Sequence, residues 1–309
     1  MANPLVSIIL CTYNGERFLK EQLDSIINQT YANIEIIISD DCSTDNTKKI
    51  LYEYVHLSNI HLYLKEINEG YIKNFQVAAS LCNGTFIAFS DQDDIWMPNK
   101  IEILLNNIDN HLLVYSDSLL VNEIGEPLNK KLSDISEMYS GKCTRGFILW
   151  NVVWGHTMLI KKELLEYCLP IPKDIPHDIW MAFKATTLSG IKYVDEVLTH
   201  YRQHDYTVTR TTYGQAKVAK RRDCKERYEE FEKKLSWFKI MRDNERDEEK
   251  LFYSNLVKFY AEKEKGFSWN LFFFMLKYHK DLFMFRKKKF LSQIIEIRKQ
   301  SRFDQLPKL

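Results

Sequence analysis

The chain has 309 residues, of which 45% are hydrophobic and 28% are charged. This composition is typical of a globular protein with a full-sized core and excludes a disordered or fibrous chain. The formal net charge is only +1, from 43 Lys and Arg against 42 Asp and Glu, which argues against a uniformly basic nucleic-acid-binding protein.

The charges are distributed unevenly along the chain. Residues 1–214 carry 18 basic and 27 acidic side chains, whereas residues 215–309 carry 25 basic and 15 acidic ones. An acidic first part and a basic second part indicate two tasks or two partners. We therefore expect a first domain over residues 1–214 and a separate basic region over residues 215–309.

The cysteines and the N-terminus bear on the cellular compartment. No two cysteines form a Cys-x-x-Cys pair, which favours reduced thiols in a cytosolic protein. They are Cys11, Cys42, Cys82, Cys143, Cys168 and Cys224. The apolar stretch at the N-terminus has no basic leader, and no apolar run reaches about 18 residues, the length of a membrane-spanning helix. We therefore expect a cytoplasmic location without a transmembrane helix.

Strand and helix signals alternate through the first part of the chain. Short apolar runs predict strands, and apolar residues every three or four positions predict helices. The expected strands are Val6–Cys11, Ile34–Ile38, His61–Lys65, Thr85–Phe89 and Leu112–Val121. The expected helices are Glu16–Asn28, a segment from Thr44 or Asp45 to about Val55, Ile72–Cys82, and a segment from Pro98 to about Asp109. The alternation predicts an α/β fold with an open, mostly parallel sheet and helices on both faces.

The later residues follow other patterns. The alternation ends at about residue 122, and loops with Gly and Pro and the aromatic stretch Phe147–Trp154 follow. Residues 217–250 mix many charges with helical apolar spacing. Phe267–Phe290 is rich in aromatic residues and ends in the basic run Arg286–Lys289. These patterns predict a helical C-terminal region.

Polar residues follow three of the expected strands. They are Thr12-Tyr13-Asn14-Gly15, Ser39-Asp40-Asp41-Cys42-Ser43 and Ser90-Asp91-Gln92-Asp93-Asp94. Ligands of open α/β sheets bind beyond the carboxyl ends of the strands. Carboxylates such as Asp91 and Asp93 suit Mg²⁺ or Mn²⁺, whose remaining ligands are phosphate oxygens and water. An ordinary loop that caps a helix has the same residue types, so both interpretations stay open on these residues alone.

As an ordered set, these strand ends resemble family-2 glycosyltransferases with the GT-A fold. The resemblance covers about residues 4–210 and rests on Val6–Asn14, Gln29–Tyr31, Ile38–Asp45, Asn68–Gly70 with Asn74, and Asp91–Trp96. The last of these is similar to the rhamnosyltransferase-like branch of bacterial surface polysaccharide synthesis. The resemblance implies a GT-A domain over residues 1–214, with a donor half of about 1–120 and an acceptor half of about 121–214, followed by the helical region.

The same resemblance implies an activity and site residues. The activity is an inverting, metal-dependent transfer of a single sugar from a UDP- or dTDP-linked donor to a hydroxyl of a glycan or lipid-linked acceptor. The donor-side residues are Thr12, Tyr13, Asp41, Lys73, Asn74 and Asp91. Asp93 would ligate Mn²⁺ or Mg²⁺, and His204 would reach the metal or the diphosphate. Cys42 stands where the family usually has glycine, and Lys73 where it usually has arginine.

The acceptor side needs a base, because the attacking hydroxyl must lose a proton. Asp178 matches the family position of that base, and the alternative is a helix N-cap. The acceptor wall would contain Trp154, His156, His177 and Trp180, for which core packing is the alternative. Arg202 or Arg210 would pair with the diphosphate.

The basic tail allows two interpretations. Its Lys and Arg side chains would bind an anionic leaflet, and aromatic residues such as Trp269 and Phe272–Phe274 would add burial at the interface. This places a peripheral protein at the cytoplasmic face of the inner membrane. A helical bundle with a solvated basic face, packed on the catalytic domain, is the alternative.

Other functions stay open at this point. A sugar nucleotidyltransferase would have a Gly-rich basic loop after the first strand, which Thr12–Gly15 is not. A glycoside hydrolase would need two carboxylates that flank the scissile bond and no nucleotide site. A non-catalytic carbohydrate-binding or scaffold protein would tolerate the loss of Asp93 and Asp178, and both are present. No Gln-x-x-Arg-Trp signature of processive polymerases occurs, which favours transfer of one sugar.

Overall fold

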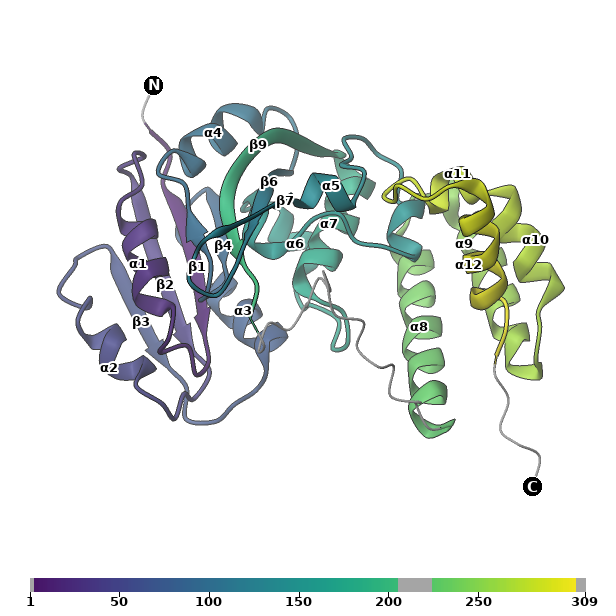
Figure 1. Cartoon of the computed structure of the whole chain (residues 1–309), viewed down its shortest axis with the longest axis horizontal. Coiled ribbons are helices and arrows are strands. Elements are labelled where there is room, and N and C mark those ends of the chain that lie inside the picture. Colours follow the sequence, from purple (N-terminus) through teal and green to yellow (C-terminus); the bar gives the residue numbers. More distant parts are fainter. Residues whose placement is uncertain (1–2, 205–223, 304–309) are drawn as a thin grey trace. The chain divides into compact units, whose positions relative to one another are not determined.

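The computed structural model describes residues 3–204 and 224–303. Over these residues the chain forms two compact units, and Figure 1 labels most of their helices and strands. The first unit takes in the described parts of Met1–Lys142 and Asn151–Arg210. The second takes in those of Cys143–Trp150 and Thr211–Leu309.

Parallel strands form the first half of the sheet in the first unit. They are β1 (Val6–Thr12), β2 (Ile34–Asp40), β3 (Ile60–Leu64) and β4 (Phe86–Ser90), in the order β3-β2-β1-β4. β1 and β2 are rich in isoleucine and buried almost throughout, as is typical of parallel strands covered on both faces. Thr12 pairs with Asp40 and Leu10 pairs with Ser90, so the carboxyl ends of β2, β1 and β4 lie side by side.

Helices connect these strands. They are α1 (Leu19–Ile27), α2 (Thr47–Tyr52), α3 (Tyr71–Ser80) and α4 (Lys100–Asn107). Every strand and helix predicted over residues 6–121 is present. α2 ends before the expected Val55, because the following turn buries Tyr54, whose hydroxyl donates to Asp24 of α1 at 2.7 Å.

The second half of the sheet is mixed. Its strands are β5 (Ile95–Trp96), β6 (Leu113–Val121), β7 (Pro127–Lys131), β8 (Met158–Lys161) and β9 (Ile191–Arg202). The order continues as β4-β8-β6-β9-β5, with β7 beside β6. β8 is antiparallel to β4 and β6, whereas β6 and β9 run parallel. The predicted parallel arrangement therefore holds for the first half of the sheet. The short antiparallel strand β8 lies between β4 and β6, and the sequence pattern did not predict it.

Short helices complete the first unit. They are α5 (Leu132–Ile135), the 3₁₀-helix η2 (Gly155–Thr157), α6 (Leu164–Cys168) and α7 (His177–Leu188). α7 packs against α3 and α6. This packing brings the beginning of α7 to the carboxyl edge of the parallel strands, where α3 also begins.

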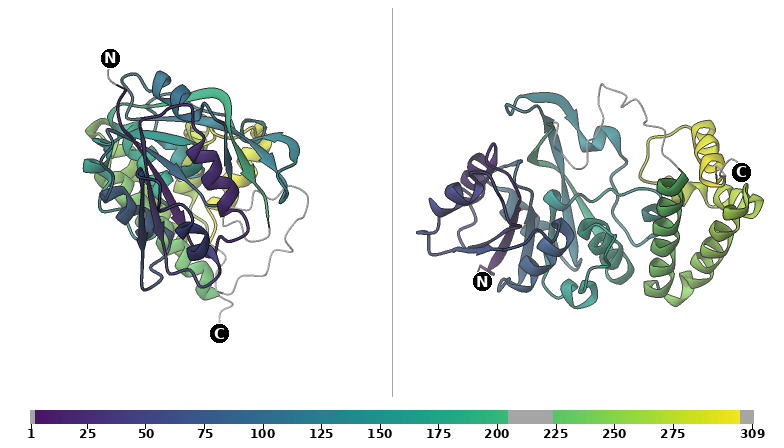
Figure 2. Two further views of the ribbon diagram at one scale, coloured as in Figure 1. Left: turned by 90° about the vertical axis from the view of Figure 1, so that its left-hand side faces the viewer. Right: turned by 90° about the horizontal axis from the view of Figure 1, so that it is seen from below.

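The second unit is helical, as predicted for the tail. It contains η1 (Arg145–Ile148), α8 (Cys224–Asn244), α9 (Asp247–Glu262), η3 (Lys263–Lys265), α10 (Trp269–Lys277), α11 (His279–Leu282) and α12 (Phe290–Gln300), seen from two further sides in Figure 2. No helix within the described ranges is long and apolar enough to cross a membrane.

A short segment from the middle of the chain belongs to this helical unit. Cys143–Trp150 packs against the C-terminal helices, far from residue 215 in sequence. The Arg145 guanidinium donates to Glu249 of α9 at 2.8 Å and to Asp281 of α11 at 2.7 Å. It also lies over the Phe252 ring, 4.5 Å from the centroid. Arg145 therefore fastens the segment to two helices at once.

We expect Arg145→Ala to lower the free energy of unfolding by roughly 2 kcal/mol, because Glu249 and Asp281 lose a half-buried partner. Denaturant unfolding measures the change. The matched control is Arg298→Ala, at an exposed position of α12, which should shift stability by less than about 0.5 kcal/mol. Equal unfolding curves for the two variants would contradict the role assigned to Arg145.

Candidate active site

The loops after β1 and β4 are joined by one side chain. The Gln92 amide nitrogen donates to the Tyr13 carbonyl at 3.0 Å, and the Tyr13 backbone N–H donates to the Gln92 side-chain oxygen at 2.9 Å. A Cβ atom at Gly15 would come within 2.3 Å of that oxygen, so a larger residue there would displace the Gln92 side chain from these bonds. The exposed Tyr13 ring is thereby held at the carboxyl edge of the sheet.

Two buried side chains, Thr12 and Asn74, form hydrogen bonds to the end of β2. The Thr12 hydroxyl donates to Asp40 at 2.9 Å, and Asp40 also accepts the Ser43 backbone N–H at 2.9 Å. The Asn74 amide donates to the Ser39 carbonyl at 2.8 Å. Thr12 and Asn74 were both predicted on the donor side. They are buried and therefore stabilise this edge of the sheet from below its surface.

Asp41 anchors the loop between β3 and α3. Its two carboxylate oxygens accept the backbone N–H groups of Glu69 at 3.1 Å and Gly70 at 2.8 Å, and the Lys65 ammonium lies 3.3 Å away. A carboxylate has about four acceptor positions, so capacity for a nucleoside is left. The next residue, Cys42, has φ +65°, the left-handed region that favours glycine, which explains glycine as the usual residue at this position.

Lys73 is an exposed cation at the same edge. Its ammonium pairs with Glu69, and 57% of its side chain is accessible. The ion pair keeps Lys73 beside the loop that Asp41 anchors. The position suits contact with a phosphate group, since an exposed pair of this kind exchanges its partner at little cost.

The acidic segment after β4 presents its three carboxylates in different environments. The Asp93 carboxylate lies 2.7 Å from the Nε2 atom of His204, so the structure brings the two predicted metal ligands together. The Asp91 side chain is 42% exposed. Asp94 is fully buried, and one of its oxygens accepts the Arg202 backbone N–H at 3.1 Å.

A buried polar network lies behind Asp94. The Nδ1 atom of His156 is 3.6 Å from both Asp91 and Asp94, and its Nε2 atom is 3.1 Å from the Ser118 hydroxyl. The Lys100 ammonium donates to the His156 carbonyl at 2.5 Å. Burial raises the pKa of the Asp94 carboxyl and lowers the pKa values of His156 and Lys100. His156, predicted on the acceptor wall, is thus a buried support of the acidic segment.

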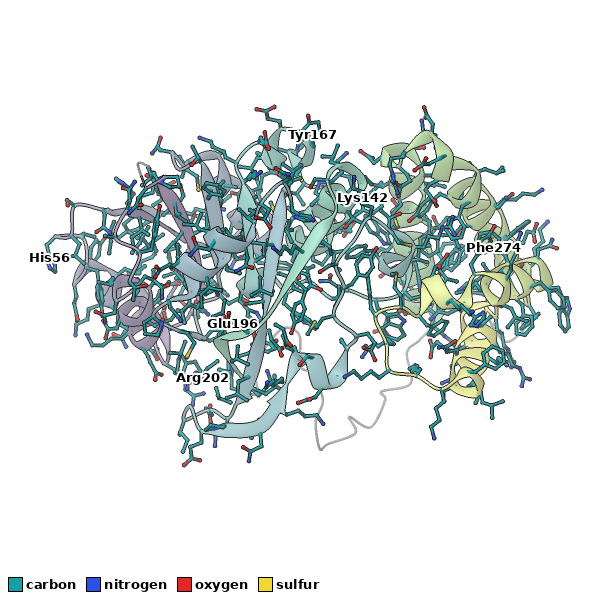
Figure 3. The ribbon with its side chains drawn as sticks, turned by 90° about the horizontal axis from the view of Figure 1, so that it is seen from above. His56, Lys142, Tyr167, Glu196, Arg202 and Phe274 are labelled. Atoms are coloured by element: carbon teal, nitrogen blue, oxygen red, sulfur yellow. The ribbon has the colours of Figure 1, made fainter. Side chains whose placement is uncertain are left out.

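Arg202 also supports this segment. Its guanidinium donates to the Asp93 carbonyl at 2.8 Å, to the Glu123 carbonyl at 2.7 Å and to the Glu21 carboxylate at 2.5 Å. Only 1% of its side chain is exposed, and Figure 3 labels its position at the end of β9. These contacts occupy the group expected to pair with a diphosphate. The alternative arginine, Arg210, lies outside the described residues.

The donor atoms present suit a divalent cation. Asp93 and His204 offer a carboxylate oxygen and an imidazole nitrogen, and the ligand atoms of Asp91, Asp94 and His156 lie within 4.8 Å of one another. In Asp94 one buried oxygen has no hydrogen-bond partner among the described residues. Oxygen ligands suit both Mg²⁺ and Mn²⁺, whereas an imidazole ligand favours the transition metal.

Asp178 lies in the first turn of α7, one residue inside its start and not at the N-cap. Its carboxylate accepts the Ile179 backbone N–H at 2.8 Å and the Asn151 side-chain amide at 3.1 Å. Burial raises the pKa of Asp178 to about 7, and the charge of Asp91 adds to the effect. A carboxyl group that titrates near neutral pH is well suited to general-base work. No motif marked Asn151, whose contact with Asp178 depends on the fold.

The remaining acceptor-side predictions lie mostly in the core. His177 is buried and stacks on Phe75 at 4.0 Å, and burial lowers its pKa to about 4. The Trp180 indole is buried and donates to the Cys168 carbonyl at 2.8 Å. Trp154 is partly exposed beside a small apolar cluster.

Tyr71 is an aromatic residue near the base that sequence analysis did not select. It opens α3 and is 46% exposed. Burial and then the charge of Asp178 raise the pKa of the Tyr71 hydroxyl. Its nearness to Asp178 makes it a candidate surface for a sugar ring, since aromatic side chains offer an apolar body with a polar tip.

Comparison with known families decides the class of this site. The model of the family "Glycosyl transferase family 2" matches residues 7–169. The chain belongs to glycosyl transferase family 2. Membership makes the protein a glycosyltransferase, which confirms the predicted enzyme class and removes the non-catalytic scaffold, the nucleotidyltransferase and the hydrolase as interpretations.

Curated relatives carry the same class of name. An uncharacterized glycosyltransferase of Rickettsia typhi is 32% identical over 232 residues, 69% of this chain and 68% of that protein. WfgD of Escherichia coli, named a UDP-Glc:alpha-D-GlcNAc-diphosphoundecaprenol beta-1,3-glucosyltransferase, is 41% identical over 113 residues, 35% of this chain and 44% of WfgD. This chain spans about two thirds of the length of the Rickettsia protein and of a Haemophilus influenzae relative, 68% and 66%.

Solved structures show the same fold. TarS of S. aureus, residues 1–349 in complex with UDP-GlcNAc, matches with a TM-score of 0.60 at 20% identity, over 94% of this chain and 79% of that chain. The mannosyltransferase PcManGT of Pyrobaculum calidifontis, in complex with GDP-Man and Mn²⁺, matches with a TM-score of 0.54 at 18% identity, over 83% and 70%. The predicted GT-A fold is confirmed.

We expect Arg202→Lys to lower the free energy of unfolding by about 3 kcal/mol, because one ammonium cannot satisfy the Glu21 carboxylate and the backbone carbonyls of Asp93 and Glu123 together. Denaturant unfolding measures this change. The control is Arg17→Lys, since Arg17 forms an exposed pair with Glu123, and its effect should stay below about 0.5 kcal/mol. If Arg202→Lys were as stable as the control, the supporting role of Arg202 would be wrong.

Proposed function

We propose that this glycosyltransferase moves a single sugar from a nucleoside diphosphate sugar to a hydroxyl of a glycan or lipid-linked acceptor, with inversion at the anomeric carbon. The observation that carries the proposal is the pairing of two kinds of carboxyl group at one edge of the sheet. Asp93 stands beside His204, whereas Asp178 has its pKa raised to about 7. The first arrangement suits a cation and a leaving diphosphate, and the second suits a base.

The donor would lie over the ends of β1, β2 and β4. Tyr13 and Asp41 would contact the base and ribose, Asp91 the ribose or the sugar, and Lys73 a phosphate. Thr12 and Asn74 would act through the shape they give to this edge. A UDP- or dTDP-linked sugar is the expected donor, and the complex of TarS with UDP-GlcNAc and the name of WfgD, which specifies UDP-Glc, support a uridine nucleotide.

Asp93 and His204 would hold the cation. A bound Mn²⁺ or Mg²⁺ would stabilise the negative charge that grows on the leaving diphosphate. The imidazole ligand favours Mn²⁺, and the PcManGT complex with Mn²⁺ supports this choice. The buried network of Asp94, Lys100 and His156 keeps the segment in place, so that no rearrangement is needed during transfer.

Asp178 would act as the base. The acceptor oxygen forms a bond to the anomeric carbon, the bond from that carbon to the diphosphate oxygen breaks, and the acceptor proton passes to the Asp178 carboxylate. Asn151 holds one carboxylate oxygen, which leaves the carboxylate oriented for proton transfer. The exposed Tyr71 and the partly exposed Trp154 are the aromatic side chains that would border the acceptor.

The names of two relatives bear on the acceptor class. WfgD is named for a diphosphoundecaprenol-linked acceptor, and TuaG of Bacillus subtilis for teichuronic acid biosynthesis. We therefore propose a role in bacterial capsule, O-antigen or exopolysaccharide synthesis. The site would work in the cytoplasm or at the cytoplasmic face of the inner membrane.

We expect Asp178→Asn to lower kcat at least about a hundredfold while donor binding persists, because general-base catalysis contributes about 10²–10⁴ in rate. In the wild type, kcat should rise with pH through about 7, since the carboxylate is the active form. Asn151→Ala should move this profile to higher pH, because the hydrogen bond it removes favours the carboxylate. Steady-state kinetics at a series of pH values measures the kcat of Asp178→Asn and the pH profiles of the wild type and of Asn151→Ala.

The control is Asp174→Asn, an exposed carboxylate a few residues earlier, which should leave kcat and its pH profile unchanged. Near-full turnover of Asp178→Asn would show that another group takes the proton. A pH profile of Asn151→Ala identical to that of the wild type would remove Asn151 as a positioning residue.

A further inference from the structure

The outer side of α10 exposes a cluster of aromatic rings. Trp269, Phe272 and Phe273 lie at helical spacing on one side, and Phe267 precedes them. The Trp269 ring lies 4.8 Å from Phe267 and 6.0 Å from Phe273. Even so, 64% of Trp269 and 60% of Phe273 are accessible. These side chains stack on one another and leave apolar area in water.

α12 lies beside α10 and exposes apolar side chains of its own. The Ser268 backbone N–H at the start of α10 donates to the Ser301 carbonyl after the end of α12 at 2.9 Å, and the rings of His279 and Phe290 are 5.1 Å apart. The two helices therefore run antiparallel, side by side. α12 adds accessible Phe290, Leu291 and Ile295, with exposed fractions of 52%, 74% and 57%.

The segment that carries these two helices is itself strongly basic, and Glu262 of the neighbouring α9 accepts hydrogen bonds from Ser268 and Asn270 at the start of α10. Residues 267–303 contain nine Lys and Arg against two Asp and Glu. Both acids are paired, since Asp281 binds Arg145 at 2.7 Å and Glu296 lies 3.5 Å from Lys288. Seven of the cations are exposed: Lys277, Lys280, Lys287, Lys289, Arg298, Lys299 and Arg302.

We infer that this face of α10 and α12 docks on the surface of an anionic lipid bilayer. Tryptophan and phenylalanine insert at the boundary between headgroups and acyl chains, while lysine and arginine meet the phosphates. A second copy of this chain fits less well, because the same positive charges would face one another. The surface lies within the second unit and stands independently of the donor site.

The test is sedimentation of the full chain with vesicles of phosphatidylglycerol and phosphatidylcholine, and with phosphatidylcholine alone. Binding is expected to the anionic vesicles only and to weaken with salt. The double variant Trp269→Ser, Phe273→Ser should lower the partition coefficient at least about tenfold. The double variant Lys287→Gln, Lys289→Gln should lower it about 25-fold, from about fivefold for each lysine.

The matched control is Leu251→Ser. It removes a side chain that is 73% exposed on α9 and follows the acidic first turn of that helix in the sequence. It should bind vesicles as the wild type does. Thermal melting and donor binding should be unchanged in every variant, which separates this inference from the proposed transfer reaction. The inference would be overturned if the wild type did not bind vesicles, or if the double variants bound anionic vesicles as strongly as the wild type does. A fall in the solution mass of the Trp269→Ser, Phe273→Ser variant would identify the face as a self-association surface instead.

Discussion

The buried carboxyl group of Asp94 constrains the acidic segment at the carboxyl edge of the sheet. Its environment is built from separate elements: Lys100 of α4, His156 of η2 and the backbone of Arg202 at the end of β9. A buried polar group that loses its partner is destabilising, so these elements hold one another in place. Asp91 and Asp93 precede Asp94 directly, and the same network therefore fixes where they present their oxygens.

Two carboxyl groups near this edge differ because their surroundings differ. Asp93 lies beside His204, a pairing suited to a cation. Asp178 is enclosed at the start of α7, and burial brings its pKa to about 7. Separating titratable groups by environment is how one site holds both a charge-stabilising and a proton-accepting carboxylate. The division of labour in the proposed reaction follows from this difference.

The donor edge could be predicted from the sequence because it depends on local order. Apolar runs set the parallel strands, and the polar residues after each run had to meet at one edge. The antiparallel β8, the role of Asn151 and the placement of Cys143–Trp150 with the C-terminal helices depend on contacts between distant residues. The sequence also did not predict which of the candidate site residues are buried. His156 and Trp180 have residue types that suit an acceptor wall, and only the packing of the folded chain shows that both lie in the interior.

The measurement that tests the account most directly is calorimetric binding of UDP-, dTDP-, GDP- and CMP-linked sugars to the full chain, with Mn²⁺ and with EDTA. The account predicts binding of one nucleotide class in the presence of Mn²⁺, and its loss in EDTA and in Asp93→Ala. Asp178→Asn should bind the same donor as the wild type does. Donor binding that is equally strong in EDTA and in Asp93→Ala would contradict the metal site, and binding of no donor would contradict the assignment of this edge.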